Sequence, residues 1–168
     1  MRNGIKQLMD LLRDGWQEVA HDTGRLLLAY LLALPVGWYR EKEAHSVGLR
    51  TFPLTAVASC GYVLLASAPH MTPDAQSRII QGLVAGIGFI GGGAILKAEG
   101  SVRGTSAAAS IWNTGALGAA VALDRFYVAA MLALLNLFAL RFFHPVKDRI
   151  DSDNGKNGTA VVPENDHK

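Results

Sequence analysis

The run Ile79–Leu96, with the sequence IIQGLVAGIGFIGGGAIL, constrains the fold of this chain most strongly. Its only polar side chain is Gln81, and it is rich in glycine. In water, each glycine disfavours a helix by about 1 kcal/mol relative to alanine. Inside a bilayer the backbone has to satisfy its own hydrogen bonds, so such a run becomes helical, and glycine lets a second helix approach closely. The run therefore predicts the packing centre of a protein that spans the membrane several times.

Composition points to the same class. Hydrophobic residues make up 50% of the 168 positions, and charged residues make up 18%, against about 25% in soluble domains. The net charge of +2 is too small to indicate nucleic acid as a partner. Cys60 is the only cysteine, which excludes a disulfide framework and a cysteine-based zinc site. We expect no cofactor, and the lipid bilayer is the first partner that the composition predicts.

Four further apolar segments have the length of a membrane span, which is about 17–20 residues for about 30 Å of hydrocarbon. These segments are Thr23–Tyr39, Phe52–Ala68, Thr105–Leu123 and Phe126–Phe143. Before them, Met1–Asp22 has an apolar residue at every third or fourth position, which predicts an amphipathic helix lying in the membrane interface. We therefore expect an all-α fold with about five transmembrane helices after an amphipathic one.

These segments divide the chain into an interfacial helix over residues 1–22, a transmembrane domain over 23–146 and a polar, disordered tail over 147–168. An odd number of spans puts the two ends of the chain on opposite sides of the membrane. Basic residues near the span ends are more numerous on the side of the tail, and such residues favour the cytoplasm. We expect the N-terminus outside and the C-terminus in the cytoplasm.

Small residues recur every fourth position in two of the predicted helices. In a membrane, this spacing lets helices contact each other backbone to backbone. The sequence thus predicts that the third and fourth spans pack together, or pack against a partner, through their small residues. The predicted helix-packing residues are Gly82, Gly86, Gly88, Gly91, Gly92, Ser106, Ser110, Thr114 and Gly118.

Two asparagines lie inside predicted spans. Asn113, which follows Trp112, has two interpretations: a hydrogen bond to another helix, or a ligand-facing amide beside the indole. Asn136 in the last span allows the same two interpretations, and we favour the interhelical hydrogen bond there.

Polar residues at the span ends predict a cluster on the cytoplasmic face. This cluster comprises Arg40, Glu41, Arg50, Thr51 and Arg103. We expect Glu41 to pair with Arg50 or Arg103 across the loops. The acidic residues near the bilayer all lie at span ends, whereas coupled ion transporters place ionisable groups inside the helix bundle. The sequence therefore predicts no metal site, and it contains no recognisable catalytic constellation.

Four blocks of sequence together resemble the MgtC/SapB family. They are Arg40-Glu41, Gly48–Thr51, Gly86–Leu96 and Val102–Trp112. The resemblance extends over roughly residues 26–143. It implies a bacterial inner-membrane protein linked to magnesium limitation, acid stress and virulence, and for the best-known member it implies action on ATP synthase. Members commonly carry a C-terminal cytoplasmic domain, in place of which we expect only a short tail here.

Three functions follow from these observations. We favour a non-enzymatic membrane protein that associates with itself or with a larger membrane complex such as ATP synthase. The alternative is a transporter or channel for Mg²⁺ or another small solute, with Arg40, Glu41 and Arg103 at its mouth and Asn113 along its path. The segment Gly86–Gly91 also matches the dinucleotide fingerprint G-x-G-x-x-G, but its apolar flanks make a nucleotide-binding enzyme the weakest of the three.

Overall fold

The computed structural model describes the backbone of residues 2–44, 48–98 and 101–157, and the side chains of residues 15–42, 48–96 and 102–142. Within these ranges the chain forms five helices and one two-stranded hairpin. In chain order they are α1 (Arg2–Ala44), α2 (Thr51–Ala66), α3 (Pro73–Gly93), β1 (Leu96–Ala98), β2 (Ser101–Arg103), α4 (Thr105–Ala122) and α5 (Phe126–Asn157). The prediction of an all-α protein is confirmed.

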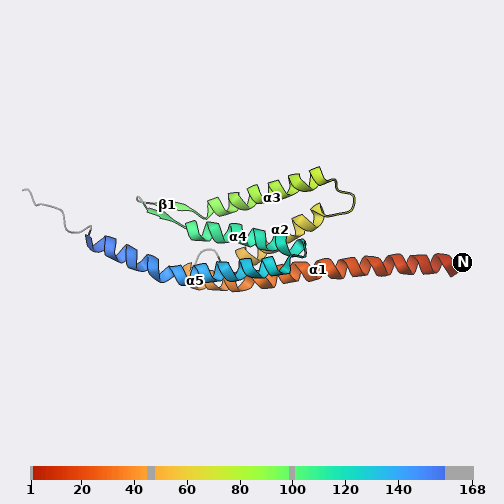
Figure 1. The fold of residues 1–168 in the computed structure, drawn as a ribbon, viewed down its shortest axis with the longest axis horizontal. Coiled ribbons are helices and arrows are strands. Elements are labelled where there is room, and N and C mark those ends of the chain that lie inside the picture. The colour runs from red at the N-terminus through yellow and green to blue at the C-terminus, as the bar shows by residue number, and fades with distance from the viewer. Residues whose placement is uncertain (1, 45–47, 99–100, 158–168) are drawn as a thin grey trace, which may run out of the picture.

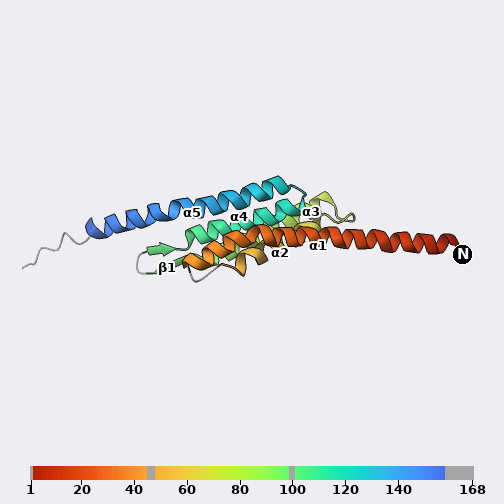
Figure 2. The ribbon, with the colours of Figure 1, turned by 90° about the horizontal axis from the view of Figure 1, so that it is seen from below.

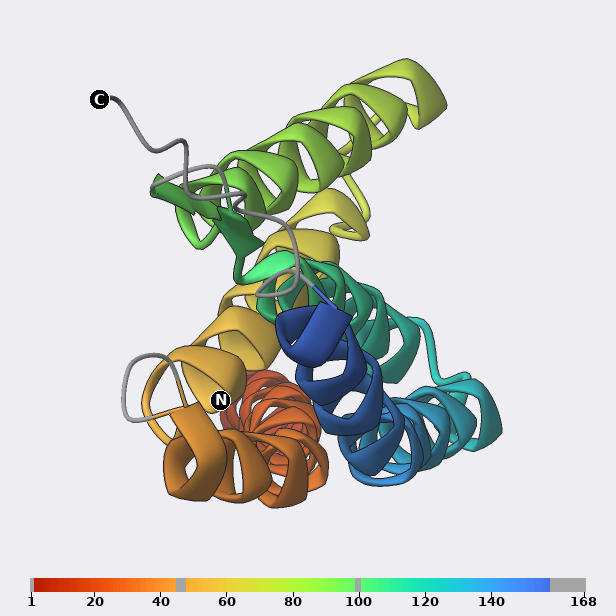
Figure 3. The same ribbon diagram turned by 90° about the vertical axis from the view of Figure 1, so that its left-hand side faces the viewer.

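The helices lie roughly along one long axis, which is horizontal in Figure 1. The first residues of α1 and the last turns of α5 lie at opposite ends of the molecule. Helices α1, α4 and α5 contact one another, and Figure 2 shows α5 and α1 running along the axis with α4 beside them. Figure 3 looks along the bundle and shows α3 leaning away from α1 and α5, with α2 and α4 between them. Helix α3 is thus attached mainly through α4 and α2.

The first helix differs from its prediction. We expected an interfacial helix that ends at residue 22 and a separate span that begins at residue 23, but α1 runs without interruption from Arg2 to Ala44. Pro35 lies within the helix and does not end it. Residues 21–24, His-Asp-Thr-Gly, are weak helix formers, but they include no proline and the helix continues through them.

The last helix also extends beyond its prediction. Helix α5 continues to Asn157, so the first half of the predicted disordered tail is helical. The rest of that tail, residues 158–168, lies outside the described residues.

The start of α3 follows from a capping sequence. Thr72 accepts a hydrogen bond from the Ala75 backbone N–H at 3.2 Å, Pro73 occupies the first helical position, and Asp74 lies in the first turn. This combination of a hydroxyl cap, proline and an acidic residue is a standard helix start. It places the beginning of the helix six residues before the expected position at Ile79.

A short antiparallel hairpin connects α3 to α4. Its strands pair Leu96 with Arg103 and Ala98 with Ser101. The sequence prediction, which continued the third helix to Leu96, missed this hairpin. The backbone of Gly104 after the hairpin has a φ of +87°, a conformation that L side chains rarely adopt, and α4 starts at the next residue.

Two apolar clusters form the core of the bundle. The larger joins α1, α2, α4 and α5 through small and medium side chains such as Ala33, Cys60 and Val121. The smaller cluster includes Val36, Phe52, Ile87 and Ile111, so it unites the first four helices near the end where α1 finishes. Much of this core is alanine, which brings the helix axes close together.

Among the described residues, no helix is both long enough and apolar enough to cross a membrane. The prediction of about five transmembrane helices therefore has no support from the individual helices. Helix α2 has 16 residues, which at 1.5 Å per residue is shorter than a hydrocarbon core of about 30 Å. Helix α3 opens with the polar sequence PDAQSR, and α4 carries Ser110, Asn113 and Thr114.

Candidate functional site

Most glycines of α3 are not packed against a neighbouring helix. A Cβ atom added at Gly82, Gly86, Gly88 or Gly92 would meet no atom within 4 Å. The prediction that these glycines contact the fourth helix is therefore wrong, because Gly82 and Gly86 border the space between α2 and α3 and the other two meet no neighbour. Their outward position leaves a small-residue surface with no partner in the described part of the chain.

Gly91 is the exception on α3. A Cβ atom there would lie 3.2 Å from the Ala108 backbone oxygen, so α3 and α4 approach each other closely at this point. Gly91 is buried, in agreement with its predicted role in helix packing.

The glycines of α4 are packed much more tightly. A Cβ atom on Gly118 would overlap the backbone oxygen of Ala56 in α2, and it would lie 2.9 Å from the Ala56 carbonyl carbon. A Cβ atom on Gly115 would overlap the Ile87 side chain of α3. Helix α4 thus uses its glycines to hold α2 and α3, and Gly115 was absent from the predicted packing residues.

The predicted small-residue stripe of α4 is largely buried. Ser110, Thr114 and Gly118 face the interior, while Ser106 is exposed. The Thr114 hydroxyl donates to the Ser110 backbone oxygen at 2.8 Å, which satisfies it within its own helix. These residues therefore present a smooth surface to the neighbouring helices.

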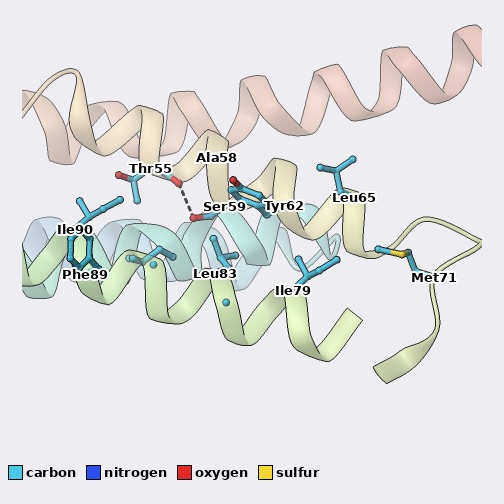
Figure 4. A pocket seen from close by; sticks show the side chains of 13 residues that line it. Thr55, Ala58, Ser59, Tyr62, Leu65, Met71, Ile79, Leu83, Phe89 and Ile90 are labelled. Carbon is cyan, nitrogen blue, oxygen red and sulfur yellow. Dashed lines mark hydrogen bonds between the residues drawn. The ribbon is translucent and has the colours of Figure 1, made fainter. Parts of the chain in front are cut away.

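An apolar groove of about 780 Å³ lies between α2 and α3 (Figure 4). Its few polar groups include Ser59, whose hydroxyl donates to the Thr55 backbone oxygen at 2.8 Å, so this group is already satisfied. Two of the open glycines, Gly82 and Gly86, line it. The remaining lining residues are Thr55, Ala58, Tyr62, Leu65, Met71, Ile79, Leu83, Ile87, Phe89 and Ile90. The groove is suited to an apolar occupant.

Asn113 and Asn136 join α4 to α5. The Asn113 side-chain amide donates to the Leu132 backbone oxygen at 3.1 Å. The Ser110 hydroxyl donates to the Asn136 side-chain oxygen at 2.8 Å, and the Asn136 amide donates back to the Ser110 backbone oxygen at 3.4 Å. Both asparagines therefore make the interhelical hydrogen bond that was the first of the two interpretations. Trp112 points outward, with 53% of its surface exposed.

The predicted polar cluster is dispersed over one end of the bundle. The Glu41 carboxylate accepts a hydrogen bond from the Leu49 backbone N–H at 3.0 Å, and the structure has no ion pair between Glu41 and the described side chains of Arg50 or Arg103. Both arginines are exposed, Thr51 is half-buried and Arg40 is buried. The expected pairing of Glu41 with an arginine is wrong, because the Glu41 carboxylate bonds instead to the Leu49 backbone N–H just before α2.

Gly48 explains how the segment before α2 lies so close to α1. A Cβ atom at Gly48 would lie 2.6 Å from the Glu41 backbone nitrogen and 2.7 Å from the Glu41 Cα atom. Gly37, one turn earlier on α1, would place a Cβ 3.2 Å from the Gly48 oxygen. The two glycines together let the Gly48–Thr51 block lie directly against α1.

At the opposite end of the bundle, an ion pair that the sequence did not predict joins α1 to the turn between α4 and α5. The Arg25 guanidinium of α1 donates through Nε to the Asp124 carboxylate at 3.0 Å, and its Nη2 atom makes a second bond to the other oxygen. Asp22 lies 3.5 Å from the same guanidinium. Asp124 is in the turn between α4 and α5, so the pair ties that turn to α1. Arg25 and Asp124 are 99 positions apart in the sequence, and no local pattern indicates that they pair.

Metal binding has no visible basis in the described side chains. They contain no group of three or more histidine, cysteine, aspartate or glutamate residues that could hold a metal ion.

Fold and site together define a small helical bundle with a buried α4, an outward glycine face on α3 and an apolar groove beside it. Comparison with known proteins places this bundle in a family, because the model described as "MgtC family" matches residues 26–149. The chain belongs to the MgtC family, as the resemblance of its sequence blocks predicted.

Curated relatives agree with this assignment. The chain is 34% identical over 132 residues to protein SrpB of Synechococcus elongatus, which covers 71% of the chain and 72% of SrpB. It is 32% identical over 126 residues to protein MgtC of Salmonella typhimurium, with 75% of the chain and 54% of MgtC covered. It is 36% identical over 103 residues to protein MgtC of Brucella abortus, with 61% and 43% covered. The chain spans about half the length of these MgtC proteins, and no solved structure matches it.

Proposed function

We propose that the chain is a non-enzymatic protein of the bacterial inner membrane that acts through helix–helix association. Its partner is a second copy of the chain or a larger membrane complex such as ATP synthase. The physiological setting that family membership favours is magnesium homeostasis, acid stress or virulence. In this proposal the start of α1 lies outside the cytoplasmic membrane and the end of α5 lies in the cytoplasm.

The outer surface of the bundle supports the membrane location. Large apolar side chains project from the described parts of all five helices. Examples are Leu31 at 58% exposure, Leu54 at 63%, Phe89 at 84%, Trp112 at 53% and Leu134 at 62%. Contiguous exposed apolar surface of this kind marks a membrane or protein contact. Because no described helix meets the length and apolarity of a span by itself, the proposal rests on the combined surface of the bundle.

The outward glycines of α3 carry the association part of the proposal. Gly82 and Gly86 are four positions apart, border the apolar groove and have no neighbour within 4 Å of an added Cβ. Small residues at this spacing are the usual contact surface between helices in a bilayer. A helix from a partner fits such a surface because its backbone can approach α3 without a steric barrier.

Fractionation tests the membrane location. The untagged chain is expected to sediment with bacterial membranes, to resist extraction by high salt and to enter solution with detergent. Recovery of a monodisperse protein from the soluble fraction without detergent would contradict the proposal.

Photo-crosslinking in intact cells tests the association. A photoreactive residue at Ala85, an exposed position between Gly82 and Phe89, is expected to give a defined adduct. Its mass distinguishes a homodimer from a complex with another protein. Gly86→Leu is expected to abolish the adduct without lowering the melting temperature, because the added side chain meets open space.

Gly24→Leu is the matched control for this experiment. Gly24 on α1 is equally open, so the substitution adds the same bulk at a distant surface. The control is expected to keep the adduct. An adduct that survives Gly86→Leu, or that Gly24→Leu abolishes equally, would contradict association through α3.

A further inference from the structure

Arg40 is a charged side chain buried inside the bundle. It follows Ala29, Ala33 and Val36 at helical spacing, so it continues the inward stripe of α1. Only 9% of its surface is exposed, and its Nε atom has no hydrogen-bond partner. An arginine is rarely buried without a counter-ion or a full set of acceptors.

The described side chains offer Arg40 no carboxylate. Its neighbour Glu41 is exposed and accepts from the Leu49 backbone N–H at 3.0 Å. A guanidinium cannot lose its charge at physiological pH, so burial without an anion is costly. The buried Arg40 guanidinium would therefore be stabilised by a negatively charged group bound beside it.

Figure 2 shows the end of α1 and the start of α4 at the same end of the bundle, from which we infer that Arg40 lies at the level of the first turn of α4. Helices α1 and α4 are antiparallel, since Arg25 bonds to Asp124 at one end and Val36 lies in the same core cluster as Ile111 further along. One helical turn beyond Val36 is Arg40, and one turn before Ile111 is Ala107. Ala107 is itself buried and belongs to the first turn of α4.

This first turn of α4 has no side-chain cap. The N-cap residue is Gly104, and the first bond of the helix runs from the Ala108 N–H to the Gly104 oxygen at 2.9 Å. The N–H groups of residues 105–107 precede that bond and form the positive end of the helix. Helix starts of this kind bind oxyanions when a cation lies beside them.

We propose that Arg40 and the first turn of α4 form a binding site for a phosphate-type oxyanion. The planar guanidinium donates to oxyanion oxygens in a forked geometry, and the helix N–H groups donate to the remaining oxygens. The phosphate belongs either to a membrane-lipid headgroup or to a free phosphate ion. Only the lipid source depends on the proposed membrane location, so the site and the proposed function can fail separately.

Thermal unfolding of the purified full chain in detergent tests the site. Potassium phosphate is compared with potassium chloride of equal ionic strength, and phosphatidylglycerol is compared with diacylglycerol, which lacks the phosphate. The wild-type melting temperature is expected to rise saturably with phosphate, with phosphatidylglycerol or with both. A response to phosphatidylglycerol alone assigns the lipid headgroup, and a response to inorganic phosphate assigns the free ion.

Arg40→Met keeps the length and apolar stem of the side chain and removes its charge. It is expected to weaken anion binding at least about tenfold. Arg50→Gln is the matched control, because Arg50 lies at the same end of the bundle but is exposed, and it is expected to keep the response. Arg40→Lys retains the charge without the fork and is expected to bind with intermediate affinity.

Two results would overturn the site. One is a wild-type chain whose melting temperature responds to neither anion beyond its chloride or diacylglycerol control. The other is an undiminished saturable response in Arg40→Met or, if that variant does not fold, in Arg40→Lys.

Discussion

Helices α3 and α4 are both rich in small residues, but the surroundings of those residues are opposite. In α4, Gly115 and Gly118 lie so close to Ile87 and to the Ala56 backbone that a methyl group would overlap them. In α3, Gly82 and Gly86 face open space. The same sequence signature thus builds the interior in one helix and a free surface in the other.

This difference separates two uses of glycine in a helix. Where a second backbone lies against it, glycine is required by geometry, and its low helix propensity is offset by packing. Where nothing lies against it, the propensity cost remains with no gain inside the chain. An open glycine face is therefore informative about partners, whereas a buried one is informative about the fold.

The largest expected effect belongs to Gly118→Ala. The added methyl group meets the backbone oxygen of Ala56, which cannot move without displacing α2. We expect the free energy of unfolding to fall by about 3 kcal/mol or more. Denaturant unfolding followed by circular dichroism in detergent measures this loss. A variant as stable as the wild type would show that α2 and α4 are not in contact at this point.

A smaller loss is expected from Asn136→Leu on the seam between α4 and α5. The substitution keeps the branched shape and the number of side-chain heavy atoms, and it removes both hydrogen bonds to Ser110. We expect a loss of about 1–2 kcal/mol in the free energy of unfolding. The double-mutant cycle with Ser110→Ala measures the coupling between the two residues. Purely additive effects would contradict a direct bond across the seam.

The smallest expected effect is a gain, from Gly86→Ala on α3. A methyl group here meets no atom within 4 Å, so only the helix propensity changes. We expect a stabilisation of about 0.5–1 kcal/mol. Gly91→Ala is the matched control, because its methyl group would lie 3.2 Å from the Ala108 oxygen and cancel that gain. Equal gains at both positions would remove the contrast between the open and the packed face.

Helix positions were predictable where the chain carries strong local signals. The expected spans 52–68 and 105–123 match α2 (Thr51–Ala66) and α4 (Thr105–Ala122) within two residues at each end. Pro69 and Gly104 explain this accuracy, because proline and a left-handed glycine interrupt helices for local steric reasons. The start of α3 was expected six residues too late, although the Thr72-Pro73-Asp74 cap that marks it is visible in the sequence.

Other features depended on contacts that no local pattern encodes. The hairpin at residues 96–103 follows an apolar run with no break, so the run resembled continuing helix. The face of α3 that contacts α4 depends on how α3 is tilted against the bundle. The spacing of glycines in the sequence does not determine that tilt. Likewise, the partner of Glu41 is a backbone N–H that reaches it only because Gly48 lies against α1.

The corner at Gly104 has a mechanical consequence. Its α-carbon lies so close to the Ala94 carbonyl that an added Cβ would overlap the oxygen and lie 3.0 Å from the carbonyl carbon. The end of one helix and the beginning of the next are thereby held as a rigid elbow, stiffened further by the paired strands beside it. A displacement of the end of α3 is consequently expected to carry the first turn of α4 with it.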